Sequence, residues 1–153
     1  MQQLFTITRQ NRKILYKFLT NVPEEALYSI PKNFNNNIWW NIAHVVVTQQ
    51  KLVYGLSGKP LNISEEWVNG YQKGTVPGEK PTSEQLEELK SLMFDLPEKT
   101  ISDYENGLFD GFKSYMTTPQ VELNSVEDAI AFNVFHEGLH LGSIMALVRA
   151  VKA

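Results

Sequence analysis

Residues 125–147, with the sequence SVEDAIAFNVFHEGLHLGSIMAL, carry the strongest helical pattern in the chain. Apolar residues recur in this segment at steps of three and four, which is the period of a helix and not of a strand. Ser125 precedes the pattern and is a suitable N-cap for the first turn. One face of the expected helix carries Ala129, Phe132, His136, His140, Ser143 and Leu147. We therefore expect a long C-terminal helix with two histidines on an otherwise largely apolar stripe.

Two earlier segments show the same period. Residues 4–19 predict a first amphipathic helix that ends near Pro23, with Ile14 on its apolar face and Arg12 among the polar residues between. Residues 38–56 predict a second helix, and its first half, IWWNIAHVVV, is apolar on nearly every side, as in a buried helix. Three consecutive valines leave a short buried strand as the alternative for this segment.

A third helix and two connections complete the expected fold. Thr82 and Gln85 predict a capping box that opens the third helix, which Pro97 either kinks or ends. Residues 57–81 and 106–124 predict long connections, and we expect the first to pack back on the helices. Four helices around one core predict an all-α protein, an antiparallel four-helix bundle.

Composition narrows the class of protein. A length of 153 residues with 42% hydrophobic residues suits a single domain over residues 1–153. The chain has no cysteine, which excludes disulfide scaffolds, catalysis by its own thiolate and cysteine metal sites. A net charge of −3 supplies no cationic field for nucleic acid. Because no apolar run reaches about 18 residues and no signal-peptide core is visible, we expect a cytoplasmic protein without membrane contact.

The chain's three histidines all lie in expected helices, His44 in the second and His136 and His140 in the fourth. Residues four apart share a helix face with Cβ atoms about 5–6 Å apart. Two imidazoles at that spacing can reach one cation at about 2.0–2.1 Å. If the second helix faces the fourth, His44 supplies a third ligand, and we predict one divalent metal ion. The alternative is that these are ordinary hydrogen-bonded histidines of the core.

The segment from His136 to His140 also matches the H-E-x-x-H pattern, in which a glutamate is the general base of a metallopeptidase. Glu137 is thus a weak catalytic candidate. The residues after His140 contain no His, Asp or Glu, so the usual downstream ligand is missing. Glu137 also lies about 100° around the helix from His136. A metallohydrolase is therefore only a minor alternative.

Four segments together resemble a known family. They are Asn37–His44, Lys51–Gly58, Tyr71–Thr75 and His136–Gly142. Their order is similar to that of the DinB/YfiT-like superfamily of metal-binding four-helix bundles, with one histidine on the second helix and an H-x-x-x-H pair on the last. The resemblance implies His44, His136 and His140 as metal ligands and a homodimer as the assembly. One departure is Ser143, where the family commonly has glutamine.

The resemblance also implies an activity. Characterised relatives are metal-dependent transferases that use a low-molecular-weight thiol such as bacillithiol, mycothiol or glutathione. The bound ion would take the cosubstrate sulfur as thiolate, which attacks a small electrophilic substrate; zinc or nickel is expected ahead of iron or manganese. A non-catalytic metal-binding stress or interaction protein is the alternative. Such thiols carry carboxylates, yet no arginine cluster near the histidines is visible in the sequence.

Other residues near the histidines in sequence have two interpretations. The aromatic residues that flank the ligands either wall an apolar pocket or pack in the core; they are Trp39, Trp40, Phe132 and Phe135. Asn41 and Thr48 share the helix face of His44, so each could orient a ligand or a substrate. Tyr115, in the second connection, could reach the site.

Overall fold

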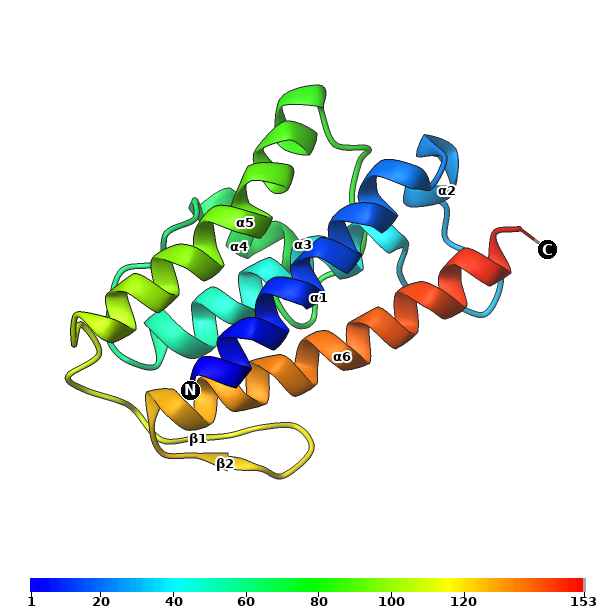
Figure 1. The fold of residues 1–153 in the computed structure, drawn as a ribbon. Coiled ribbons are helices and arrows are strands. Elements are labelled where there is room, and N and C mark those ends of the chain that lie inside the picture. The colour runs from blue at the N-terminus through cyan, green and yellow to red at the C-terminus, as the bar shows by residue number, and fades with distance from the viewer. Residues whose placement is uncertain (153) are drawn as a thin grey trace.

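Helices make up most of residues 1–152, which are the residues described by the structure, a computed structural model (Figure 1). The helices are α1 (Gln2–Asn21), α2 (Glu24–Tyr28), α3 (Ile38–Gln50), α4 (Glu65–Tyr71), α5 (Ser83–Glu105) and α6 (Val126–Ala150). A π-helical turn, η1 (Lys51–Gly55), continues α3. The strands β1 (Tyr115–Met116) and β2 (Glu122–Leu123) form an antiparallel pair. The all-α class is confirmed.

The four long helices lie side by side, but their directions differ from a simple up-and-down order. In Figure 1, α1 and α6 run from the same end of the molecule, whereas α3 and α5 both run the opposite way. The reason is the connection over residues 56–82, which returns the chain along α3 before α5 begins and packs α4 against α3. As a result α3 packs on α6, and α1 packs on both α6 and α5.

The second predicted helix is the most buried element of the fold. Every residue of α3 except Thr48 is buried, as its uniformly apolar first half predicts. Asn37 caps this helix, because its side-chain oxygen accepts a hydrogen bond of 2.8 Å from the Trp40 amide. The helical prediction for this segment is confirmed over the strand alternative. The π-helical turn at its end was not predicted.

The buried face of α1 differs from the prediction. Its buried residues are Phe5, Thr8, Arg12, Leu15 and Leu19. Ile14 is 43% exposed, whereas Arg12 is completely buried, so the expected assignment of these two residues was wrong. The physical reason is a partner on another helix, since Arg12 forms an ion pair with the equally buried Glu137 of α6. A hydropathy pattern cannot anticipate a buried charge whose partner is distant in sequence.

The connections contain more structure than expected. The short helices α2 and α4 were not predicted, although Trp67 of α4 is 4% exposed and packs back on the core as anticipated. The predicted capping box of Thr82 and Gln85 is present. Pro97 does not end α5, which continues to Glu105. None of the helices in residues 1–152 combines the length and the apolar character needed to span a bilayer.

Candidate metal centre

The three histidines meet between α3 and α6. The ring centroid of His44 lies 5.2 Å from that of His136 and 4.8 Å from that of His140. The two α6 rings are 4.5 Å apart, as expected for residues one helical turn apart. One nitrogen from each ring can be chosen so that all three lie within 4.8 Å of one another. The cluster could therefore hold one metal ion.

The orientation of His44 is set by the end of another helix. Its Nδ1 donates a hydrogen bond of 2.7 Å to the carbonyl oxygen of Tyr71, the last residue of α4. Carbonyl groups in the last turn of a helix lack an internal partner, so this oxygen is free to accept. The Trp40 ring stacks on the imidazole, with centroids 4.6 Å apart and planes 10° apart. With Nδ1 protonated, Nε2 keeps its lone pair, and the Thr48 hydroxyl lies 3.2 Å from it.

His140 is oriented in the same manner by a side chain of α3. Its Nδ1 donates to the Asn41 side-chain oxygen over 2.8 Å. Asn41 is itself fixed, because its amide nitrogen donates to the Asn37 carbonyl and to Asn36 Oδ1 at 2.7 and 2.9 Å. Metal-binding histidines commonly donate their second ring nitrogen in this way, which leaves the other nitrogen free as a ligand.

The third histidine has a nitrogen without a partner. His136 Nδ1 is buried and makes no hydrogen bond within residues 1–152. Buried polar atoms are nearly always satisfied, so an orphaned imidazole nitrogen beside two oriented imidazoles calls for an additional binding partner. A divalent cation bound by the three rings would take one nitrogen from each, and three nitrogen donors suit zinc, nickel or iron. The residues present therefore fit a metal ion.

Burial keeps all three imidazoles neutral. Burial, followed by the neighbouring His140, His44 and Arg12, lowers the pKa of His136 from 6.5 to about 3. Burial and His44 lower the pKa of His140 to about 4. The pKa of His44 is also lowered, first by burial and to a smaller degree by Lys51, against the hydrogen bond to Tyr71. Neutral imidazole is the form that binds metal, so the cluster needs no deprotonation near pH 7.

A cavity of about 530 Å³ adjoins the cluster. His44, Thr48 and His136 form part of its lining. Its walls are mainly apolar. They are formed by Leu52 of η1, by Leu56 directly after η1, and by Phe132, Phe135 and Leu139 of α6. The hairpin segment contributes Tyr115, Thr117, Thr118 and Pro119, and two lysines, Lys51 and Lys73, complete the lining. This size is typical of a small-molecule site.

The flanking residues divide between pocket and core. Phe132, Phe135 and Tyr115 line the cavity, whereas Trp39 is in the core and donates its indole N–H to the Tyr71 hydroxyl over 2.8 Å. Trp40 packs on His44 instead of lining the cavity. Sequence reasoning did not identify the Tyr71 carbonyl as a support or Lys51 and Lys73 as lining residues. The one available signal was Ser64 followed by two glutamates, a helix-start pattern that would have revealed α4.

Glu137 lies on a different side of α6 from the histidines. Its Oε1 accepts from Arg12 Nη2 at 2.7 Å, from Arg12 Nε at 3.0 Å and from Asn133 Nδ2 at 2.9 Å. Its side chain is completely buried and is not part of the cavity lining. A general base must reach its substrate. This placement gives no support to the peptidase alternative.

Comparison with known proteins agrees with this architecture. No curated protein matches the chain. A family model described as the DinB superfamily matches residues 7–144, a span that contains all three histidines and the residues that line the cavity. The chain therefore belongs to the DinB superfamily.

Proposed function

We propose that this protein is a metal-dependent enzyme that transfers a low-molecular-weight thiol to a small electrophile. A divalent ion would be held by His44, His136 and His140. The observation that carries the proposal is the cavity of about 530 Å³ lined by His44 and His136. Structural metal sites are closed, whereas catalytic sites keep an open position for substrate. A cluster that only joined α3 to α6 would need no adjoining cavity.

The residues around the cavity suit this chemistry. A divalent ion bound by three neutral imidazoles supplies a Lewis acid that lowers the pKa of a bound thiol or water. The Tyr71 carbonyl and Asn41 hold the ligand rings in place, and the apolar walls restrict water. The chain has no cysteine, so the sulfur must come from a cosubstrate.

The test is turnover by metal-loaded protein without a histidine tag. Bacillithiol, mycothiol and glutathione are each offered with an activated aryl chloride, and product is measured with zinc-loaded, nickel-loaded and chelator-treated protein. We expect turnover with at least one thiol, its loss on chelation with an unchanged far-ultraviolet circular dichroism spectrum, and recovery when metal returns. His136→Ala should behave like chelated protein.

A different result would identify a non-catalytic metal-binding protein instead. Metal-loaded protein that turns over none of the thiols, and that loses its helical signal when metal is removed, would be a non-catalytic metal-binding protein. In that case the ion would contribute mainly to folding, as in small metal-dependent domains.

A further inference from the structure

Two lysines from separate segments line the cavity. Lys51 begins the π-helical turn after α3, and Lys73 lies two residues beyond α4. Both line the same cavity as His44 and His136. Among the described residues of this lining there is no aspartate or glutamate, although the chain as a whole has a net charge of −3. The cavity therefore has the opposite sign of charge from the protein.

The ammonium groups of these lysines bond only neutral acceptors. Lys51 Nζ donates to Gln72 Oε1 at 2.6 Å, and Lys73 Nζ donates to Thr118 Oγ1 at 2.7 Å. Four other lysines are paired with carboxylates; the pairs are Lys59 with Asp110, Lys80 with Glu24, Lys90 with Glu87 and Lys99 with Asp103. A cation held by an amide or a hydroxyl can exchange that partner for an anion, because charge-assisted hydrogen bonds are about twice as strong.

We propose that Lys51 and Lys73 form an anion subsite of the cavity, and that its ligand is an organic anion with an apolar part. Leu52, Phe132 and Phe135 supply the apolar wall of the same cavity. The proposal rests on the proposed function in so far as it assigns this cavity to substrate. Lysine is a compact point charge that accepts carboxylate and phosphate alike, so the shared property of the ligand is its negative charge.

The test compares matched probes on metal-free protein by isothermal titration calorimetry at low salt. The probes are 4-phenylbutyrate, 4-phenylbutyl phosphate and the neutral 4-phenylbutan-1-ol, which share one apolar part. We expect at least one anion to bind about tenfold or more tightly than the alcohol, and this preference to weaken at high salt. The tighter of the two anions identifies the preferred group.

Two variants assign the preference to the lysines. Lys51→Met and Lys73→Met keep an apolar stem and remove the charge, so each should weaken anion binding about tenfold and leave alcohol binding unchanged. Lys17→Met is the matched control, because Lys17 is an exposed lysine of α1 outside the cavity lining, and it should bind both probes as wild type does.

Equal affinity for anions and alcohol would overturn the subsite, as would absence of binding or an anion preference that survives in both cavity variants. The titration uses neither metal nor electrophile, so its result is separate from that of the turnover assay. If the protein prefers anions but shows no turnover, the anion subsite is supported and the proposed transferase activity is contradicted.

Discussion

Two polar clusters occupy neighbouring positions of α6 and have opposite characters. His136 belongs to the cluster that adjoins the cavity, whereas Glu137 belongs to a closed cluster with Arg12 and Asn133. Arg12 and Glu137 are completely buried and their charges cancel. The histidine cluster, formed by His44, His136 and His140, combines neutral donors with an adjoining cavity and contains no anion. We call it the open cluster. Removing either charge of the closed pair would leave the other buried and unpaired, while donors left open beside a cavity are available for binding.

Helix geometry separates the two clusters. Successive residues of a helix point about 100° apart, so His136 and Glu137 cannot share a face. Residues four apart do share one, which joins His136 to His140 and Asn133 to Glu137. Helix α6 thus contacts α1 through the Arg12–Glu137 ion pair and α3 through the hydrogen bond from His140 to Asn41. The ion pair can hold the position of α6 while the histidines remain free for a ligand.

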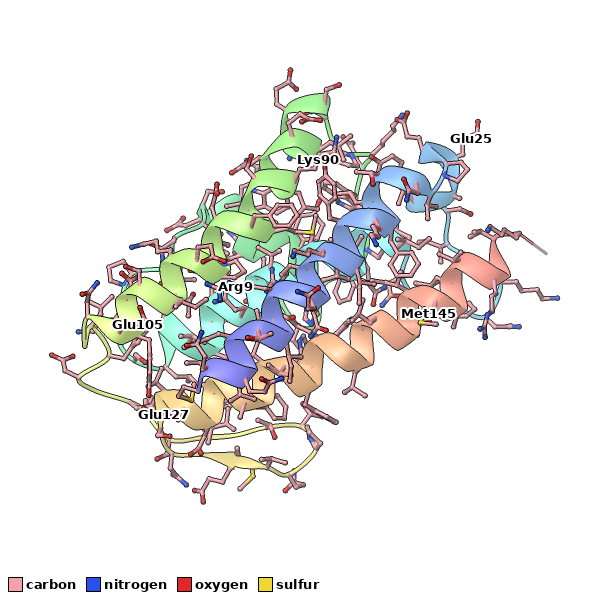
Figure 2. The ribbon with its side chains drawn as sticks, in the orientation of Figure 1. Arg9, Glu25, Lys90, Glu105, Glu127 and Met145 are labelled. Carbon is pink, nitrogen blue, oxygen red and sulfur yellow. The ribbon has the colours of Figure 1, made fainter. Side chains whose placement is uncertain are left out.

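Removing one partner of the closed cluster should have the largest effect. Glu137→Ala leaves the Arg12 charge buried and unpaired, and we expect a loss of about 3–5 kcal/mol in the free energy of unfolding. Urea denaturation of metal-free protein measures it. The control is Arg9→Ala, because Arg9 lies where α1 adjoins α5 (Figure 2) and its ion pair with Glu98 is partly exposed, so the pair should contribute about 1 kcal/mol or less. A loss as small as that of the control would mean that the buried pair is not structural.

Removing a support of the open cluster should act on metal affinity and not on folding. Asn41→Ala deletes the acceptor of the His140 Nδ1 hydrogen bond, and we expect metal to bind about 10–100-fold more weakly. Competition with a chromophoric chelator measures the affinity. Asn41→Asp keeps an acceptor at this position but cannot donate to the Asn37 carbonyl or to Asn36 Oδ1, so it should retain part of the affinity. Equal loss in both variants would argue against a role through this hydrogen bond.

Lowering the pH should destabilise the metal-free protein, because His136 and His140 of the open cluster are held neutral in the folded state. The pKa values of His136 and His140, about 3 and about 4, lie below the unfolded value of 6.5, so below pH 6.5 the unfolded chain binds more protons than the folded one. Stability is then complete above about pH 6.5 and falls as the pH decreases toward 4. At pH 5.5 we expect a loss of about 2–3 kcal/mol in urea denaturation, the sum of about 1.4 kcal/mol for each histidine. His136→Asn should flatten this dependence, and an unchanged slope in that variant would contradict the assignment.

The all-α class and the meeting of the three candidate histidines could be predicted from sequence because both depend on local periodicity. The i, i+4 spacing of His136 and His140 specifies one helix face, and the apolar surroundings of His44 specify a buried helix that must contact another. The cap residues Asn37 and Ser125 mark the starts of both helices.

The features that were missed depend on contacts between distant residues. Arg12 and Glu137 are 125 positions apart, and Lys73 and Thr118 are 45 apart, so neither pair leaves a periodic signal. The support of His44 is a backbone carbonyl, whose position depends on where α4 ends and not on the identity of Tyr71. A hydropathy pattern assigns a charged residue such as Arg12 to the surface unless its partner is known.

Metal content per chain tests the central claim most directly, namely that the open cluster and not its closed neighbour binds the ion. Wild type, His44→Ala and Glu137→Gln are purified without a tag and measured by inductively coupled plasma mass spectrometry on the folded fraction. We predict about one equivalent in wild type and in Glu137→Gln, and less than a tenth of an equivalent in His44→Ala. Equal metal in wild type and His44→Ala, or loss of metal in Glu137→Gln alone, would contradict this account.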